Sequence, residues 1–109
     1  MKILKPEFQR KDDRGSLTQV ITDNFKQLNV LEIAKGEKFG NHYHKIKHEV
    51  FYIISGRILL KIDQNDWIMM NEGTAFLIEP GDRHTIEAIR NTVIAETLSH
   101  PYDKGDTYE

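Results

Sequence analysis

The sequence predicts an all-β protein, a barrel or sandwich built from short strands. Runs of β-branched and aromatic residues recur along the 109-residue chain, and turn residues separate them at regular intervals. No window of ten or more residues shows a convincing helical repeat. The apolar content of 39% and the charged content of 29% indicate a folded, soluble protein. The length fits a single domain spanning residues 1–109.

The strands expected in chain order are separated by recognisable turns. Asp12–Gly15 predicts the first turn, Asp63–Asp66 a hairpin loop and Pro80–Asp82 a late turn, while Lys35–Asn41, with two glycines, predicts a loop. The expected strands are residues 17–22, 28–34, 49–54, 57–62, 67–70, 74–78, 84–89 and 92–98. The run at 49–54, EVFYII, has the clearest strand composition. Residues 100–109 are polar, and we expect a tail or a segment that covers a sheet edge.

Composition excludes several classes of function. The net charge is −2 and no basic patch is visible, so we expect no nucleic-acid partner. The chain has no cysteine, which excludes disulfides, thiolate metal sites and a cysteine nucleophile. The first ten residues lack the apolar run of a signal peptide, and no later segment is long and apolar enough to predict a membrane span. We therefore expect a cytoplasmic protein.

The most informative segment runs from Gly36 to Gly56, with the sequence GEKFGNHYHKIKHEVFYIISG. His42 and His44 are two residues apart, so on an extended strand both side chains reach the same face. Glu49 joins them only if the chain turns between His44 and Glu49 and returns on the next strand. Imidazole nitrogen and carboxylate oxygen are ligands of first-row transition metals, so the segment predicts a metal site.

A further ligand is available downstream. His84, in IEPGDRHTIEA, could complete the set with His42, His44 and Glu49. The expected cofactor is one divalent transition metal ion, Zn, Mn, Fe, Ni or Co. Positions left open beyond these ligands would admit water or substrate, as in catalytic rather than structural metal sites.

This pattern resembles the cupin superfamily, small jelly-roll β-barrels (double-stranded β-helices) with a central metal. The first cupin motif is filled at every position by Gly36, His42, His44, Glu49 and Gly56. In the second motif Gly73, Gly81 and His84 match, but Pro80 stands one place later than the usual proline and Ala88 replaces an asparagine. The resemblance implies that the four predicted ligands hold the metal, and that these two departures affect the turn rather than the site.

Within the superfamily, the chain is similar to small RmlC-like cupins of surface-polysaccharide biosynthesis. The similar segments are Asp13–Ser16, Gly40–His44 and the end from Thr97 to Tyr108. This group includes nucleotide-sugar 3,4-ketoisomerases and the cupin domain of a capsular-polysaccharide epimerase. The resemblance implies a metal-dependent isomerase or epimerase acting on a nucleotide sugar or related carbohydrate. Two alternatives stay open: a non-haem iron dioxygenase, and a non-catalytic sugar-binding or regulatory cupin.

Strand alternation assigns neighbouring side chains to faces. Phe51 and Ile53 share the phase of Glu49, so we expect them inside the barrel, and Tyr43 is expected to face outward. The resemblance implies a homodimer. The outward apolar side chains of this strand, Val50, Tyr52 and Ile54, with Trp67 as a possible addition, favour the same arrangement.

Candidate residues for binding and catalysis are less well defined. Arg57 and Lys61 share one strand face and could hold an anionic group such as a diphosphate if that face is interior, although a solvated face is an equal alternative. A general base should have a pKa near neutrality. The sequence offers only His48 and Glu79 for that role, and alternation favours a solvated position for His48.

Overall fold

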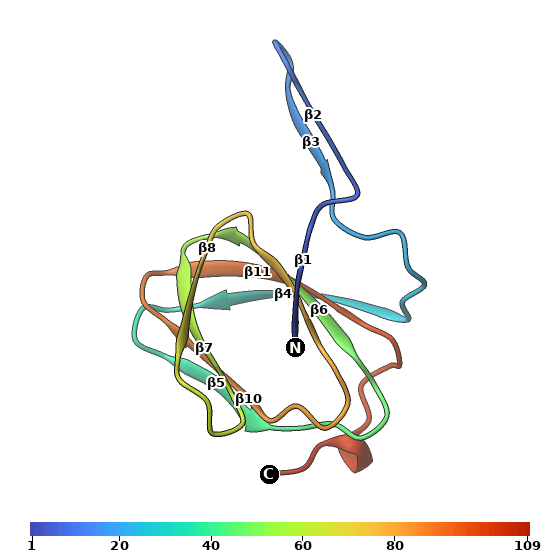
Figure 1. The fold of residues 1–109 in the computed structure, drawn as a ribbon, viewed down its shortest axis with the longest axis vertical. Coiled ribbons are helices and arrows are strands. Elements are labelled where there is room, and N and C mark those ends of the chain that lie inside the picture. Colours follow the sequence, from blue (N-terminus) through green and yellow to red (C-terminus); the bar gives the residue numbers. More distant parts are fainter.

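The computed structural model describes residues 1–109, which form eleven strands and one short 3-10 turn (Figure 1). The strands are β1 (Lys2–Leu4), β2 (Phe8–Asp12), β3 (Gly15–Gln19), β4 (Gln27–Ile33), β5 (Lys38–His42), β6 (Glu49–Ser55), β7 (Arg57–Ile62), β8 (Ile68–Asn71), β9 (Ala75–Ile78), β10 (His84–Ala88) and β11 (Thr92–Leu98). The 3-10 turn η1 spans Lys104–Asp106. This composition confirms the all-β prediction.

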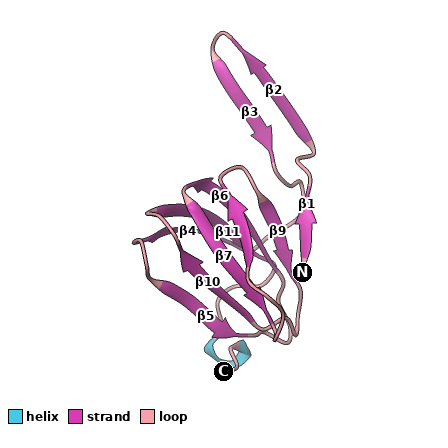
Figure 2. Cartoon of the chain, turned by 60° about the vertical axis from the view of Figure 1, so that its left-hand side comes forward, coloured by secondary structure: helices cyan, strands magenta, loops and turns pink.

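Two antiparallel sheets enclose the core. One has the strand order β1-β9-β6-β11-β4, and the other has the order β5-β10-β7-β8. Figures 1 and 2 show the two sheets wrapped around a common interior, the jelly-roll barrel predicted from the sequence. The hairpin of β2 and β3 forms a separate two-stranded sheet and projects away from the barrel.

Strand alternation fills the barrel with apolar side chains. On β7, Ile58, Leu60 and Ile62 point inward, and each is almost completely buried. Phe51 of β6 stacks on Phe76 of β9 with ring centroids 5.1 Å apart. These side chains belong to a cluster of twelve buried apolar residues. The expected interior positions of Phe51 and Ile53 are confirmed, since both are buried in this cluster.

The structure corrects the predicted loop at 35–41, because residues 38–42 form strand β5. Gly40 in this strand has a φ of 98°, and a Cβ there would lie 2.6 Å from the carbonyl oxygen of His84. The pairing of β5 with β10 shifts register between His84 and Thr85, next to this close approach. The glycine therefore marks a bulge inside a strand, where the backbone of β10 leaves no room for a side chain.

The first strands also begin earlier than predicted. The turn after Asp12 is confirmed, but it joins β2 to β3 in a hairpin that starts at Phe8. No helix of the structure has the length and apolar character required to cross a membrane.

Candidate metal centre

Three strand ends bring the predicted ligands to one end of the barrel. His42 is the last residue of β5 and stands directly opposite His84, the first residue of β10. Glu49 is the first residue of β6, and the segment between β5 and β6 carries His44. The ring nitrogens of the three histidines lie within 4.8 Å of one another. The Oε1 atom of Glu49 lies 2.8 Å from Nε2 of His44 and 3.7 Å from Nε2 of His84. The structure thus brings all four side chains together.

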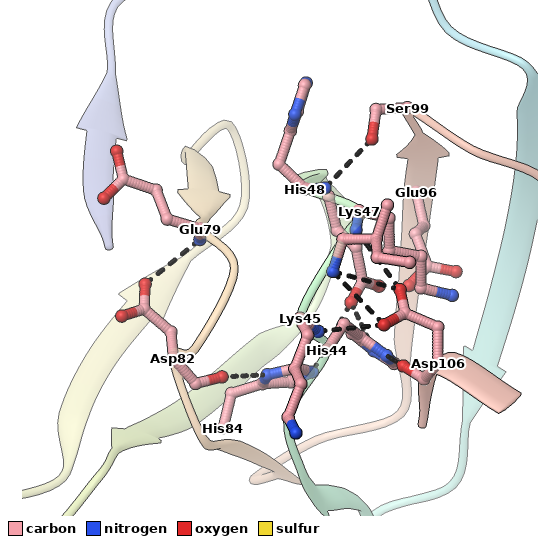
Figure 3. Close-up of polar contacts among 12 residues, drawn as sticks. His44, Lys45, Lys47, His48, Glu79, Asp82, His84, Glu96, Ser99 and Asp106 are labelled. Atoms are coloured by element: carbon pink, nitrogen blue, oxygen red, sulfur yellow. Dashed lines mark hydrogen bonds and ion pairs between the residues drawn. The ribbon is translucent and has the colours of Figure 1, made fainter. Parts of the chain in front are cut away.

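Two histidine rings are held by backbone carbonyl groups. Nδ1 of His44 lies 2.8 Å from the carbonyl oxygen of Asp106, and Nδ1 of His84 lies 3.0 Å from the carbonyl oxygen of Asp82 (Figure 3). A carbonyl oxygen only accepts, so each Nδ1 donates the hydrogen. In the neutral rings, Nε2 therefore presents a lone pair to the interior, as required of a histidine that ligates a metal.

The Glu49 carboxylate lacks a positively charged or hydrogen-donating partner at one of its oxygens. Oε1 of Glu49 is buried and receives no hydrogen bond. The Nε2 atoms of His44 and His84 lie beside it, and their lone pairs face it when the rings are neutral. Two acceptors at 2.8 Å repel each other unless a proton or a metal ion lies between them. Three imidazoles and one carboxylate around such a point fit a divalent transition metal ion.

The pKa shifts follow from burial and from this crowding. Burial, together with the charge that His84 and His44 would carry, lowers the pKa of His42 to about 4. Burial also lowers the pKa of His84. Burial opposes protonation of His44 too, but the protonated ring would donate hydrogen bonds to Glu49 and to the Asp106 carbonyl group, and these raise its pKa overall. Neutral His42 and His84 are available as ligands near neutral pH, because only unprotonated imidazole binds metal.

The buried carboxyl group of Glu49 pairs with the partly buried carboxyl group of Glu96. Burial favours a neutral Glu49, but the hydrogen bond that a protonated His44 would donate to it and the hydrogen bond to Glu96 outweigh burial and lower its pKa to about 2. Burial, followed by the hydrogen bond to Glu49, raises the pKa of Glu96 to about 8. Nδ2 of Asn29 donates a 2.9 Å hydrogen bond to Oε1 of Glu96. Glu96 is thus a protonated carboxyl group beside the ligand set at neutral pH.

The four side chains line one cavity of about 350 Å³. Beyond them, its polar lining includes Asn29, Lys47 and Glu96, while its apolar walls come from Leu31, Phe39, Phe51, Ile86 and Leu98. Lys47 is 4% exposed and is the only lysine or arginine in the lining. Its Nζ atom lies 5.6 Å from the ring centroid of Tyr102, which also lines the cavity.

The two predicted base candidates lie outside this cavity. The side chain of His48 is 39% exposed, and its Nε2 atom lies 3.7 Å from a carboxylate oxygen of Asp23. The side chain of Glu79 is 41% exposed and pairs with Lys2. Both residues border a cleft on the outer surface instead. Figure 3 shows the His48 ring pointing away from His44. Neither residue lines the cavity that holds the histidine cluster, so the prediction that either acts as a base there is wrong.

The inward orientation considered for Arg57 and Lys61 is also wrong. Strand β7 turns its isoleucines and Leu60 inward, so Arg57 and Lys61 face outward. Nε of Arg57 donates a 2.7 Å hydrogen bond to the side chain of Asn71. Nζ of Lys61 lies 5.8 Å from the ring centroid of Trp67, beside an outer cleft. Neither residue lines the cavity.

Sequence reasoning missed Glu96, Lys47 and Asp106. A signal for Glu96 existed, because it shares strand phase with the buried Ile94 and Leu98, so a carboxyl at that position faces the core. Tyr43 is placed as expected on the outer side, where its ring stacks on Tyr108 at 5.3 Å.

A family model for the cupin domain matches residues 29–101. The chain belongs to the cupin family. The match contains every predicted ligand, and it confirms the family suggested by the two sequence motifs.

Solved cupin structures share the fold. The QdtA 3,4-ketoisomerase of Thermoanaerobacterium thermosaccharolyticum, in a double-mutant complex with TDP, superposes with a TM-score of 0.84 at 24% identity, covering 97% of this cupin and 84% of the ketoisomerase. CapF, solved with a tropolone inhibitor, superposes with a TM-score of 0.68 at 26% identity, covering 93% of this cupin and 33% of CapF.

Curated relatives match only in part. An oxidoreductase of Arthrobotrys oligospora is 31% identical over 67 residues, which is 62% of this cupin. The chain spans 26% of that relative and 40% of a second one, a tetracenomycin polyketide synthase protein of Streptomyces glaucescens.

Proposed function

We propose that this cupin binds one divalent transition metal ion through His42, His44, Glu49 and His84. The observation that carries the proposal is a cluster of three imidazoles, two of which, His44 and His84, lie within 3.7 Å of a buried carboxylate oxygen that receives no hydrogen bond. Backbone carbonyls already fix His44 and His84 with Nε2 turned toward that oxygen. An ion bound by four ligands would keep positions open and would act as a Lewis acid on a carbonyl group placed beside it.

The proposed activity is proton transfer next to the carbonyl group of a keto-sugar nucleotide, as in an isomerase or epimerase of surface-polysaccharide biosynthesis. Glu96 is the carboxyl group of the cavity that lies outside the ligand set. It sits on the inward face of β11, and Asn29 orients it by a hydrogen bond to Oε1. We assign to Glu96 the transfer of the proton. Its pKa of about 8 leaves a fraction ionised near neutral pH, and that carboxylate would take the proton from the carbon next to the carbonyl group. The carboxylic acid so formed would return the proton to the substrate.

Lys47 is the proposed contact for negative charge on the substrate. It is the basic side chain of the lining, whereas Arg57 and Lys61 lie outside. A buried ammonium group is costly without a partner, so an anionic ligand group beside it would be favoured. The apolar lining residues Leu31, Phe39 and Ile86 would exclude water from part of the ligand surface.

The structural neighbours support this choice of substrate class. One is a 3,4-ketoisomerase solved with TDP, and the resemblance to polysaccharide cupins comes from separate sequence segments. A nucleotide sugar exceeds a cavity of about 350 Å³, so we propose that the keto-sugar occupies the cavity and the nucleotide extends outside. The cytoplasm remains the proposed location.

A homodimer is the proposed assembly. Edge strand β4 exposes Leu28 and Val30 on the outer face of its sheet, with exposed fractions of 57% and 61%. Ile54 of β6 is 48% exposed. Val50, which was expected to contribute, is instead buried, and Trp67 belongs to a cleft beside the other sheet. An apolar outer face and an unpaired strand edge favour association with a second copy.

The activity is tested by hydrogen exchange from solvent. The metal-loaded protein is incubated with candidate 4-keto-sugar nucleotides in heavy water, and the sugar ring protons are followed by NMR. We expect exchange that disappears on chelation and that falls at least about 100-fold in Glu96→Gln. Lys47→Met should raise the substrate concentration required for half-maximal exchange. Absence of exchange, together with oxygen consumption on another substrate, would identify a dioxygenase. Absence of both reactions would favour a binding protein.

A further inference from the structure

The segment that links two proposed ligands depends on one carboxylate from the far end of the chain. Three consecutive backbone N–H groups between His44 and Glu49 point toward Asp106. Lys45 N–H donates to Oδ1 at 2.9 Å and Lys47 N–H donates to Oδ2 at 3.2 Å, while Ile46 N–H is shared between both oxygens at 3.2 and 3.3 Å. Figure 3 shows this fan of contacts converging on the Asp106 side chain.

Asp106 also contacts a proposed ligand directly. Its backbone carbonyl oxygen is the acceptor for Nδ1 of His44, at 2.8 Å. One residue, 5% exposed, therefore holds the His44 ring through its main chain and the following three residues through its side chain. Consecutive N–H groups that point to one place form an anion-binding nest, and here the anion is the carboxylate of Asp106.

The Asp106 position is fixed independently of these contacts. It ends η1, where its N–H donates to the carbonyl oxygen of Asp103 at 3.0 Å and the Asp103 side chain accepts from Gly105 N–H at 2.8 Å. Beyond it, Tyr108 and Tyr43 exchange two backbone hydrogen bonds of 2.9 and 3.0 Å. Since Tyr43 directly precedes His44 and Lys45 directly follows it, the end of the chain is attached to the backbone on both sides of His44.

We infer that Asp106 is a positioning residue of the metal centre. It sets the tautomer and direction of His44, and it fixes the path from His44 to Glu49. The inference rests on the proposed function, because it concerns the same metal. Groups that orient metal ligands typically change metal affinity about 10- to 100-fold when removed. Residues 106–109, Asp-Thr-Tyr-Glu, thereby acquire a physical role, since they attach the tail to the ligand-bearing segment.

The test compares Asp106→Ala and Asp106→Asn with Glu109→Gln, an exposed carboxyl change in the same segment that serves as the control. Zinc affinity is measured by competition with a chromophoric chelator. We expect Asp106→Ala to bind zinc about 10- to 100-fold more weakly. Asp106→Asn, which keeps one acceptor oxygen, should lie between Asp106→Ala and wild type, and Glu109→Gln should match wild type.

A second readout uses the metal-free protein. In wild type, hydrogen-exchange NMR should find the amides of Lys45, Ile46 and Lys47 protected, and Nδ1 of His44 protonated. Asp106→Ala should lose the amide protection while the amides of β6 and β11 stay protected.

A folded Asp106→Ala variant with wild-type zinc affinity would overturn the inference, as would unprotected amides in wild type. If wild type binds no zinc, the proposed metal site fails, and the NMR measurement alone decides whether Asp106 orients His44. If Asp106→Ala does not fold, Asp106→Asn and wild type provide the same two outcomes.

Discussion

Oε1 of Glu49 and Nε2 of His44 lie 2.8 Å apart in the interior of the barrel, and the Asp106 carbonyl holds the only hydrogen of a neutral His44 ring on the opposite nitrogen. Such a contact is repulsive without a positive charge between the atoms. It explains why the pKa of His44 rises although burial opposes its protonation. Protonation of His44 would satisfy this pair in the metal-free protein, and the proposed metal ion would take the place of the proton.

The Glu49–Glu96 pair predicts that the free energy of unfolding of the metal-free protein, prepared with a chelator, depends on pH. Burial and the bond to Glu49 raise the pKa of Glu96 from 4.5 to about 8. A carboxyl group with a raised pKa binds its proton more tightly in the folded state. Its stabilising effect is complete below pH 4.5 and is lost as the pH rises through 8.

Urea unfolding of wild type and Glu96→Gln between pH 5 and 9 measures this effect. The stability of wild type relative to Glu96→Gln should fall as the pH rises, because glutamine cannot release a proton. Glu32→Gln, on the exposed face of β4, is the control, and its difference from wild type should stay flat. A flat difference for Glu96→Gln as well would show that Glu96 is not the protonated member of the pair.

Gly40→Ala should destabilise the protein more than Gly36→Ala. Both glycines have positive φ values, 98° and 88°, so both substitutions carry the backbone cost of about 1 kcal/mol. Only at Gly40 would the new Cβ meet a backbone atom, the His84 oxygen at 2.6 Å, whereas nothing lies within 4 Å at Gly36.

Thermal unfolding and zinc affinity of the two variants provide the measurement. Because β10 must move to admit the methyl group, and His84 begins β10, Gly40→Ala should also weaken zinc binding. Equal stability losses in the two variants would show that the close approach of β5 and β10 is not constraining.

The proposed dimer predicts a selective effect on the outer face of β4. Val30→Lys places a charge at the centre of the apolar edge and should convert the dimer to a monomer of about 12.7 kDa. Met69→Lys, at an exposed apolar position on β8 of the other sheet, should leave the dimer intact. Light scattering at micromolar concentration distinguishes the two states. A wild-type monomer would refute the dimer, and an unaffected Val30→Lys dimer would place its interface elsewhere.

Spacing in the sequence was sufficient to predict that the proposed ligand side chains meet, because His42 ends one strand, His44 follows it by two residues and Glu49 starts the next strand. Alternation likewise predicted the buried Phe51 and Ile53. The same alternation could have predicted the orientation of β7. Its apolar residues at 58, 60 and 62 lie on one face, which implies that Arg57 and Lys61 face outward.

Other features depend on contacts between distant segments. β5 was mistaken for a loop because Gly36 and Gly40 suggest turns, and the close approach of β10 that requires Gly40 is visible only in the folded chain. Asp106 resembles any polar tail residue until the end of the chain folds back onto Lys45–Lys47. A local pattern cannot predict such contacts, because they depend on how the two sheets close.

The most direct test of the metal centre is the zinc content of the purified protein after loading and removal of free ion, determined by elemental analysis. Wild type should hold one ion per chain. The double variant His42→Ala/His44→Ala should hold none, because two of the four ligands are absent. His48→Ala, which removes a histidine outside the cavity, is the control and should keep a full equivalent. A full equivalent of zinc in the double variant, or none in wild type, would contradict the assignment of the metal centre.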